Sequence, residues 1–194
     1  MLVLISGPSG AGKTTFVNSL LENDPRVEFS VSTTTRPMRG SEIEGVDYHF
    51  VDEAGFDKLL ADDAFVEWAV VHDHRYGTRK EHVQGIVEEG LIPLLDLDVQ
   101  GGKQVIDLYG DELVSVFVFP PSWEVLEARL RGRNTDGDAV IQTRLDNARW
   151  EVDYAKHYRY WIVNDDLNEA MRRMQSIITA ERCRRDRFAE PPLG

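Results

Sequence analysis

The segment "GPSGAGKT" at residues 7–14 directly follows the apolar run "LVLIS" at residues 2–6. Its spacing, a glycine, four residues, then Gly-Lys-Thr, is the pattern of a phosphate-binding P-loop. Apolar residues recur at helical spacing from Phe16 to Leu21, so an amphipathic helix should follow the loop. A buried strand, a glycine-rich turn and a helix in this order predict the first unit of an α/β fold.

The chemistry of this loop predicts a nucleoside triphosphate site. Glycines allow backbone N–H groups to turn towards phosphate oxygens, and the unpaired N–H groups at a helix N-terminus favour an anion. We expect Lys13 to reach the β- and γ-phosphates and the Thr14 hydroxyl to coordinate Mg²⁺. The loop residues predicted to bind ATP are Gly7, Pro8, Ser9, Gly10, Ala11, Gly12, Lys13, Thr14 and Thr15.

Further apolar runs predict that the first strand belongs to a parallel sheet. Continuous apolar stretches cover residues 91–98, 113–119 and 160–164, as expected for strands buried on both faces. Helical patterns accompany them, at residues 14–23, 55–61, 80–90, 123–132, 139–155 and 167–188. This alternation favours a parallel α/β sheet flanked by helices.

Length and composition limit the classes of protein to which the chain can belong. Its 194 residues suit one compact domain over 1–194. The net charge of −12 argues against nucleic-acid or anionic-membrane binding, because both require a basic face. A single cysteine excludes an intramolecular disulfide, and no apolar stretch is long enough to span a bilayer. We therefore expect a cytoplasmic protein without nucleic-acid or membrane partners, and a flexible tail at 189–194.

The segment "STTTRPMRG" at residues 32–40 places Arg36 and Arg39 close together in an otherwise acidic chain. Guanidinium groups bind phosphate oxygens in bidentate fashion. The hydroxyls of residues 32–35 and of Tyr48 would add neutral donors. If the acceptor is a phosphate monoester, its attacking oxygen is already anionic and needs no general base. The chain has no Asn-Lys-x-Asp guanine reader of the GTPase type. Among P-loop proteins, the class that remains is a small phosphotransferase with a phosphorylated acceptor.

Six segments in order resemble the guanylate kinase family, most closely its bacterial form. They are "VSTTTRPMRGSEIEGVDYHFV", "FVEWAVVHDHRYGT", "LLDLDVQGG", "RLRGRNTD", "TRLDNARWE" and "IVNDD". The resemblance runs from the N-terminus to about residue 188. It implies transfer of the γ-phosphoryl group of ATP to GMP, giving ADP and GDP, with Mg²⁺. We expect dGMP to be accepted as well.

The resemblance also implies a P-loop nucleoside monophosphate kinase fold with three parts. The core comprises residues 1–29, 79–125 and 150–188. A GMP-binding lobe is inserted at 30–78, a region rich in Thr, Ser and Gly, and a helical lid lies at 126–149. Arg133 and Arg144 match the lid arginines that stabilise the transition state, and Asn164 matches the position near the adenine.

The GMP site follows from the same resemblance. The positions implied to surround the phosphate are Ser32, Arg36, Arg39, Tyr48 and Tyr76. Glu67 would read the guanine edge and Thr78 would donate to its O6. Guanine presents N1–H and the N2 amino group as adjacent donors, which a carboxylate accepts together, whereas adenine has an acceptor at N1. Such a paired contact contributes about 1–3 kcal/mol of discrimination.

Asp96 and Asp98 end the apolar run at alternate positions, so we expect both carboxylates to point the same way, at the edge where parallel sheets bind ligands. The resemblance places Asp96 beside the GMP site. A role for Asp98 near Mg²⁺ is our own inference.

Two other functions remain as alternatives. One is an interaction module of the same fold that binds phosphopeptides, although such modules typically lose the P-loop lysine and the acidic residues near the nucleotides. The other is a related kinase for a different phosphorylated acceptor such as a phosphosugar, which would not need a guanine reader.

Overall fold

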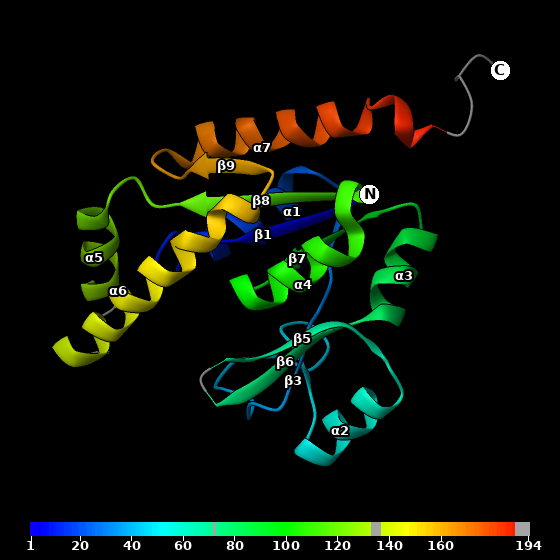
Figure 1. Cartoon of the computed structure of the whole chain (residues 1–194), viewed down its shortest axis with the longest axis horizontal. Helices are drawn as coiled ribbons and strands as arrows, with labels where there is room; N and C mark the ends of the chain where they lie inside the picture. The colour runs from blue at the N-terminus through cyan, green and yellow to red at the C-terminus, as the bar shows by residue number, and fades with distance from the viewer. Residues whose placement is uncertain (72, 133–136, 189–194) are drawn as a thin grey trace.

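A five-stranded parallel sheet forms the centre of the computed structural model, which describes residues 1–71, 73–132 and 137–188 (Figure 1). The strand order is β2-β7-β1-β8-β9, and every neighbouring pair is parallel. The strands are β1 (Leu2–Ser6), β2 (Val27–Phe29), β7 (Ile92–Asp96), β8 (Leu113–Phe119) and β9 (Tyr160–Val163). The expected fold class, a parallel α/β sheet with helices on both faces, is confirmed.

Alternate residues of β1 point into two different cores. Val3 and Ile5 join the cluster covered by α1 (Lys13–Asn23) and α7 (Leu167–Arg182). Leu2 and Leu4 join the cluster on the opposite face, which includes residues of α3 (Lys80–Glu88) and α4 (Val99–Tyr109). Because both faces of the sheet are covered, its strands need to be apolar throughout rather than alternating.

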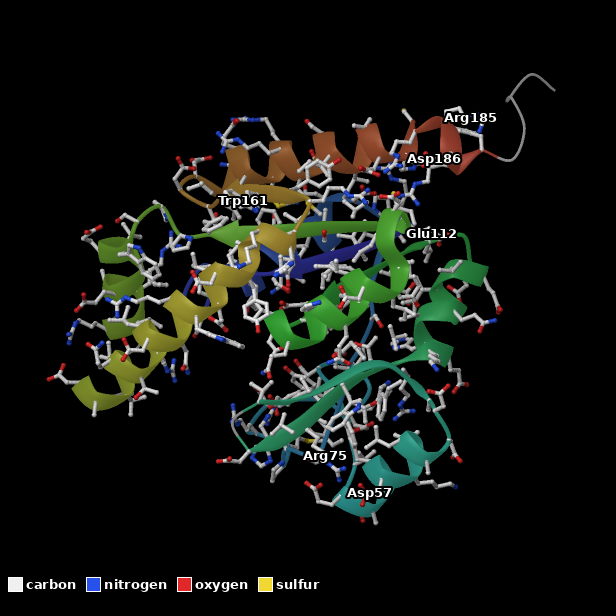
Figure 2. The ribbon with its side chains drawn as sticks, in the orientation of Figure 1. Asp57, Arg75, Glu112, Trp161, Arg185 and Asp186 are labelled. Atoms are coloured by element: carbon white, nitrogen blue, oxygen red, sulfur yellow. The ribbon has the colours of Figure 1, made fainter. Side chains whose placement is uncertain are left out.

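A second sheet lies below α4 in Figure 1 and has the order β4-β3-β6-β5. Its elements are β3 (Thr33–Thr34), β4 (His49–Phe50), α2 (Glu53–Ala61), β5 (Phe65–Val71) and β6 (His74–Arg79). The fully buried Phe56 ring of α2 stacks on Phe65, with ring centroids 4.6 Å apart. The Arg75 guanidinium lies over the Phe56 ring, 4.7 Å from its centroid, and pairs with Asp57 (Figure 2).

Two helices, α5 (Trp123–Arg131) and α6 (Asp138–Asp153), form a separate pair beside the parallel sheet (Figure 1). They share a small apolar cluster of their own: Leu126, Leu130, Ile141, Leu145 and Ala148. The remaining elements are the 3₁₀ turns η1 (Gly110–Glu112), η2 (Tyr154–His157) and η3 (Arg185–Arg187). Among the described residues, no helix has the length and apolar character needed to cross a membrane.

The structure corrects four sequence-based expectations. The strand predicted for 91–98 ends at Asp96, and α4 begins at Val99 although no helix was predicted there. Gly101 and Gly102 fall within α4, and their low helix propensity weakens the helical pattern of this segment in the sequence. The short strand β2 was also missed. The last helix, predicted to continue to 188, ends at Arg182.

Candidate active site

The loop between β1 and α1 is held tightly against the ends of its neighbouring strands. Gly12 adopts a φ of 90°, and a Cβ built on it would lie 2.5 Å from Asn164 Nδ2. On Gly7, an added Cβ would overlap the carbonyl oxygen of Val118. Glycine is therefore required at both positions, for backbone conformation and for close approach. Lys13 folds back over the loop, and its Nζ donates to the Gly7 carbonyl at 2.8 Å.

Two side chains support this loop from behind. Asn164 is buried, and its Nδ2 donates to the Ala11 carbonyl at 2.9 Å. The Arg129 guanidinium of α5 donates to the same carbonyl at 3.2 Å and to the Asn164 carbonyl at 3.3 Å. Asn164 thus contacts the P-loop backbone, and its place near the adenine stays a prediction. Nothing in the local sequence distinguishes Arg129 from Arg131 of the same helix.

A single cavity of about 410 Å³ extends from the P-loop to the second sheet. It is lined by Pro8, Ser9, Gly10, Gly12, Lys13, Thr14, Thr15, Ser32, Tyr48, Glu67, Ala69, Val71, Tyr76, Asp96, Leu97, Asp98 and Glu151. Most residues predicted for the two nucleotide sites therefore face one space. Gly7, Ala11, Asn164, Arg36, Arg39 and Thr78 do not line the cavity.

The Arg36 side chain lies 5% exposed behind the tyrosines of the cavity wall. Its guanidinium donates to Glu42 at 2.6 and 3.0 Å and to the Pro37 carbonyl at 2.7 Å. Its Nε donates to the Tyr76 hydroxyl at 3.2 Å, and its Cζ lies 5.2 Å from the centroid of the Tyr48 ring. The Arg36 guanidinium holds the pKa of the Glu42 carboxyl below its usual range. These contacts fix Arg36 in one position.

Arg39 lies on the surface, and its backbone N–H donates to Glu42 at 2.7 Å. Its side chain is not held in place by the same network as Arg36. The pair predicted from "STTTRPMRG" therefore divides into one fixed and one exposed cation.

The three threonines of "STTTRPMRG" do not face the cavity, contrary to our expectation. Thr33 Oγ1 accepts from Arg79 Nε at 2.8 Å, and Thr34 Oγ1 donates to the Arg75 carbonyl at 3.0 Å. Thr35 Oγ1 accepts from the Arg75 backbone N–H at 3.0 Å. These hydroxyls connect strands of the second sheet. Among the hydroxyl residues at 32–35, the cavity is lined by Ser32 alone.

Glu67 is a buried acidic residue of the cavity wall. Its side chain is 4% exposed, and burial raises the pKa of its carboxyl to about 7. The Thr78 hydroxyl donates to Glu67 Oε1 at 2.6 Å, which opposes the rise, while the charge of Asp98 adds to it. The two residues are paired across β5 and β6. A buried carboxyl with one neutral partner and an open cavity before it is suited to accept further hydrogen bonds.

Asp96 and Asp98 both line the cavity, but from different local structures. Asp96 ends β7, where burial raises the pKa of its carboxyl and the Lys13 ammonium opposes the rise. Asp98 caps α4, and its Oδ1 accepts from the backbone N–H groups of Gln100 at 3.0 Å and Gly101 at 2.8 Å. The prediction that both close one strand is wrong, although both carboxylates reach the same cavity.

Glu151, near the end of α6, was missed by sequence reasoning. It lines the cavity beside the P-loop, where burial raises the pKa of its carboxyl and the Lys13 ammonium and the Ser9 backbone N–H lower it. On the same helix, Arg144 is half-buried. The predicted Arg133 lies outside the described residues, as does the tail at 189–194. The charge pattern of α6 alone does not separate Glu151 from the exposed acids around it.

These features define a class of protein. A P-loop on the first strand of a parallel sheet faces, across one cavity, a second sheet with a fixed arginine and two tyrosines, which is the arrangement of a small P-loop phosphotransferase with an anionic acceptor. The guanylate kinase family model matches residues 1–181, and the chain belongs to the guanylate kinase family. The chain therefore catalyses the reaction of that family, the ATP-dependent phosphorylation of GMP.

Individual relatives agree with this result. The chain is 49% identical over 187 residues to the guanylate kinase of Rhizobium etli, covering 96% of this chain and 85% of the relative. It is 49% identical over 188 residues to that of Syntrophotalea carbinolica, covering 97% and 89%. The solved guanylate kinase of Anaplasma phagocytophilum superimposes with a TM-score of 0.80 at 33% identity, over 97% of this chain and 89% of that one. The family, the fold and the reaction expected from the sequence are confirmed.

Proposed function

We propose that GMP binds between the two sheets, with its base on Glu67 and its phosphate on the loop at residues 32–40, while ATP binds across the P-loop. The observation that carries this assignment is that one cavity joins the P-loop to the buried Glu67 carboxyl and to Tyr48 and Tyr76. The two anionic substrates then meet beside Lys13.

The guanine edge is read by Glu67 and Thr78. When ionised, the Glu67 carboxylate accepts from both N1–H and the N2 amino group. Thr78, which donates to Glu67 in this structure, can redirect its hydroxyl to guanine O6. An adenine would place the lone pair of its N1 against the carboxylate, which leaves a buried acceptor unsatisfied. Since only the base and phosphate are read, dGMP is also a substrate.

The GMP phosphate is held by Ser32, Arg36, Arg39, Tyr48 and Tyr76. The Arg36–Glu42 pair and the Arg36–Tyr76 bond orient the guanidinium in advance, so little conformational entropy is lost on binding. Arg39, which is exposed, completes the phosphate site by moving onto its outer side. Asp96 lies at the junction of the two substrates. The dianionic phosphate oxygen attacks without a general base.

The triphosphate lies on the loop N–H groups of residues 7–15, and Lys13 neutralises charge on the β- and γ-phosphates. The Thr14 hydroxyl and the Asp98 carboxylate both line the cavity and are oxygen donors of the kind that Mg²⁺ prefers. When bound, Mg²⁺ would neutralise phosphate charge. Asn164 shapes the adenine end of this site.

Arg133, which follows α5 in the chain, and Arg144 of α6 act on the transition state. Residues 126–149 act as the lid, 30–78 as the GMP-binding lobe, and the remainder of 1–188 as the core. A lid arginine that arrives on closure neutralises charge and excludes water from the transferring group. The protein acts in the cytoplasm, on small-molecule substrates alone.

A coupled assay with Mg-ATP tests the assignment, using GMP, dGMP, AMP, CMP, UMP and ribose phosphates as acceptors. We expect rapid ADP formation with GMP and dGMP and little with AMP. Glu67→Gln, which replaces one acceptor oxygen by a donor, should reduce the preference for GMP over AMP. Equal turnover of GMP by Glu67→Gln and the unmodified protein would contradict the role of Glu67.

A further inference from the structure

The Glu67 carboxylate rests directly on the first turn of α4. A Cβ built on Gly101 would overlap Glu67 Oε2 and lie 3.1 Å from Glu67 Cδ. The same Cβ would lie 3.6 Å from Asp98 Oδ1, which is an ordinary contact. The Glu67 carboxylate can therefore occupy its position only because Gly101 has no side chain. A Cβ at residue 101 would leave Asp98, which caps the helix, in ordinary contact.

A second contact joins α4 to β5, one helical turn beyond Gly101. The Gln104 side chain donates from Nε2 to the Trp68 carbonyl at 2.8 Å and accepts from the Trp68 backbone N–H at Oε1, at 3.4 Å. Strand β5 is at the edge of its sheet and pairs with β6 on one side. The Gln104 side chain thus hydrogen-bonds to the backbone of Trp68, the residue after Glu67, as a neighbouring strand would.

We propose that Gly101 and Gln104 are positioning residues for the guanine reader, and that α4 thereby sets the selectivity of the enzyme for its acceptor base. The inference rests on the proposed role of Glu67. Gln104 fixes the backbone of β5 beside Glu67, and Gly101 leaves the space that the carboxylate occupies. Both contacts connect the second sheet to a helix of the core, so the reader is positioned by the core rather than by its own sheet alone.

The physical reason is the geometry of a paired hydrogen bond. A carboxylate can accept from N1–H and from the N2 amino group only when both of its oxygens lie within about 3.2 Å of these nitrogens. A methyl group at position 101 would move the carboxylate by roughly 1 Å to regain ordinary contact. That displacement breaks or lengthens at least one of the two bonds.

The test compares Gly101→Ala with Gly85→Ala, a matched control on α3, where a Cβ would meet no heavy atom within 4 Å. The readout is the ratio of kcat/KM for GMP to that for inosine monophosphate, whose base lacks the 2-amino group. We expect Gly101→Ala to lower kcat/KM for GMP by roughly 5- to 150-fold, the range that corresponds to loss of one paired base contact. The GMP preference should shrink, while the KM for ATP stays unchanged.

Gln104→Ala supplies a second variant that adds no volume and alters an exposed side chain. We expect a several-fold rise in the KM for GMP with kcat unchanged. Combining Gly101→Ala with Glu67→Gln should cost little more than Glu67→Gln alone, because the carboxylate has then already been lost. A general structural defect would instead lower kcat for both GMP and inosine monophosphate and leave the ratio of their kcat/KM values unchanged.

Glu67→Gln is measured alongside to separate two failures. In one outcome, Glu67→Gln reduces the preference for GMP over inosine monophosphate while Gly101→Ala and Gln104→Ala leave it unchanged. That result overturns the positioning proposal and leaves the proposed role of Glu67 as the guanine reader intact. If Glu67→Gln leaves the preference intact, Glu67 is not the reader, and both proposals fail together. Additive effects of Gly101→Ala and Glu67→Gln would also overturn the positioning role.

Discussion

Arg36, in the loop proposed to bind the GMP phosphate, forms a two-bond ion pair with Glu42, just beyond that loop, at 2.6 and 3.0 Å. Since the Arg36 side chain is 5% exposed and Glu42 is 22% exposed, the arginine is the inner member of the pair. The acidic partner therefore holds the cation in place from the outer side, and the phosphate does not have to order it.

This arrangement makes lysine a poor substitute for Arg36. An ammonium cannot contact Tyr76, Glu42 and a phosphate at once, because it lacks the planar fork of five N–H donors. We expect Arg36→Lys to raise the KM for GMP about 10-fold or more, as the loss of roughly 1.5–3 kcal/mol of charged hydrogen bonding implies. Steady-state kinetics with GMP varied at saturating ATP measures this. Glu42→Gln, which keeps one acceptor oxygen, should have the smaller effect; a larger one would mean that Glu42 rather than Arg36 dominates the phosphate site.

The raised pKa of Glu67, about 7, predicts a pH dependence of stability. Between its ordinary value of about 4.3 and about 7, the unfolded chain holds fewer protons than the native protein, so the contribution of Glu67 to the free energy of unfolding falls as pH rises. This contribution is fully present below about pH 4.5 and is lost as the pH rises through about 7, to an extent on the order of 3 kcal/mol.

Denaturant unfolding of the unmodified protein and of Glu67→Gln at pH 5 and pH 8 measures this effect. We expect Glu67→Gln to gain stability relative to the unmodified protein as the pH rises. A constant difference between the two proteins across this range would show that Glu67 ionises normally. In calorimetry near pH 6, GMP binding should release more protons from the unmodified protein than from Glu67→Gln, since the base requires the carboxylate.

Lys13 should act mainly on the chemical step. Its Nζ contacts the Gly7 carbonyl here, and we expect it to move onto the phosphates when ATP binds. Lys13→Met should lower kcat by about 10²- to 10³-fold, the usual effect of removing one transition-state donor. Lys103→Met is the control, because Lys103 pairs with Asp107 on the surface of α4 at 2.5 Å. Equal kcat values for the two variants would exclude a catalytic Lys13.

Two roles of Asp98, helix capping and metal binding, can be separated by substitution. Asparagine is also a good N-cap, so Asp98→Asn should retain stability, whereas Asp98→Ala should lose about 1 kcal/mol. If Asp98 also faces Mg²⁺, both variants should require several-fold more Mg²⁺ for half-maximal activity. Mg²⁺ titrations and denaturant unfolding measure the two effects independently. An unchanged Mg²⁺ requirement in Asp98→Asn would leave capping as its role.

The second sheet depends on one aromatic residue. Phe56 is fully buried against Phe65, and Arg75 covers it. Phe56→Ala should reduce the free energy of unfolding by about 3–5 kcal/mol, the usual cost of truncating a core phenylalanine. Denaturant unfolding measures the loss, and hydrogen exchange should show weaker protection in β5 and β6. A loss below about 1 kcal/mol would mean that the site collapses around the cavity.

The sequence determined the parallel core and the phosphate-binding loop because both depend on local patterns. Continuous apolar runs predicted β1, β7 and β8, and the spacing of glycine, lysine and threonine predicted the loop at residues 7–14. Helix α4 was not predicted, because two glycines lower the helix propensity of its sequence. It forms nonetheless, since its apolar face packs on the sheet and Asp98 caps its first turn.

Only the tertiary structure decided which polar side chains face the cavity. The four hydroxyls at residues 32–35 are alike in sequence, yet Ser32 lines the cavity while those of Thr33, Thr34 and Thr35 bond within the second sheet. Likewise, nothing local connects Gly101 to Glu67, which are separated along the chain and meet where α4 crosses β5. Local patterns specify strands, loops and helices, but the direction of a polar side chain depends on partners brought from distant parts of the chain.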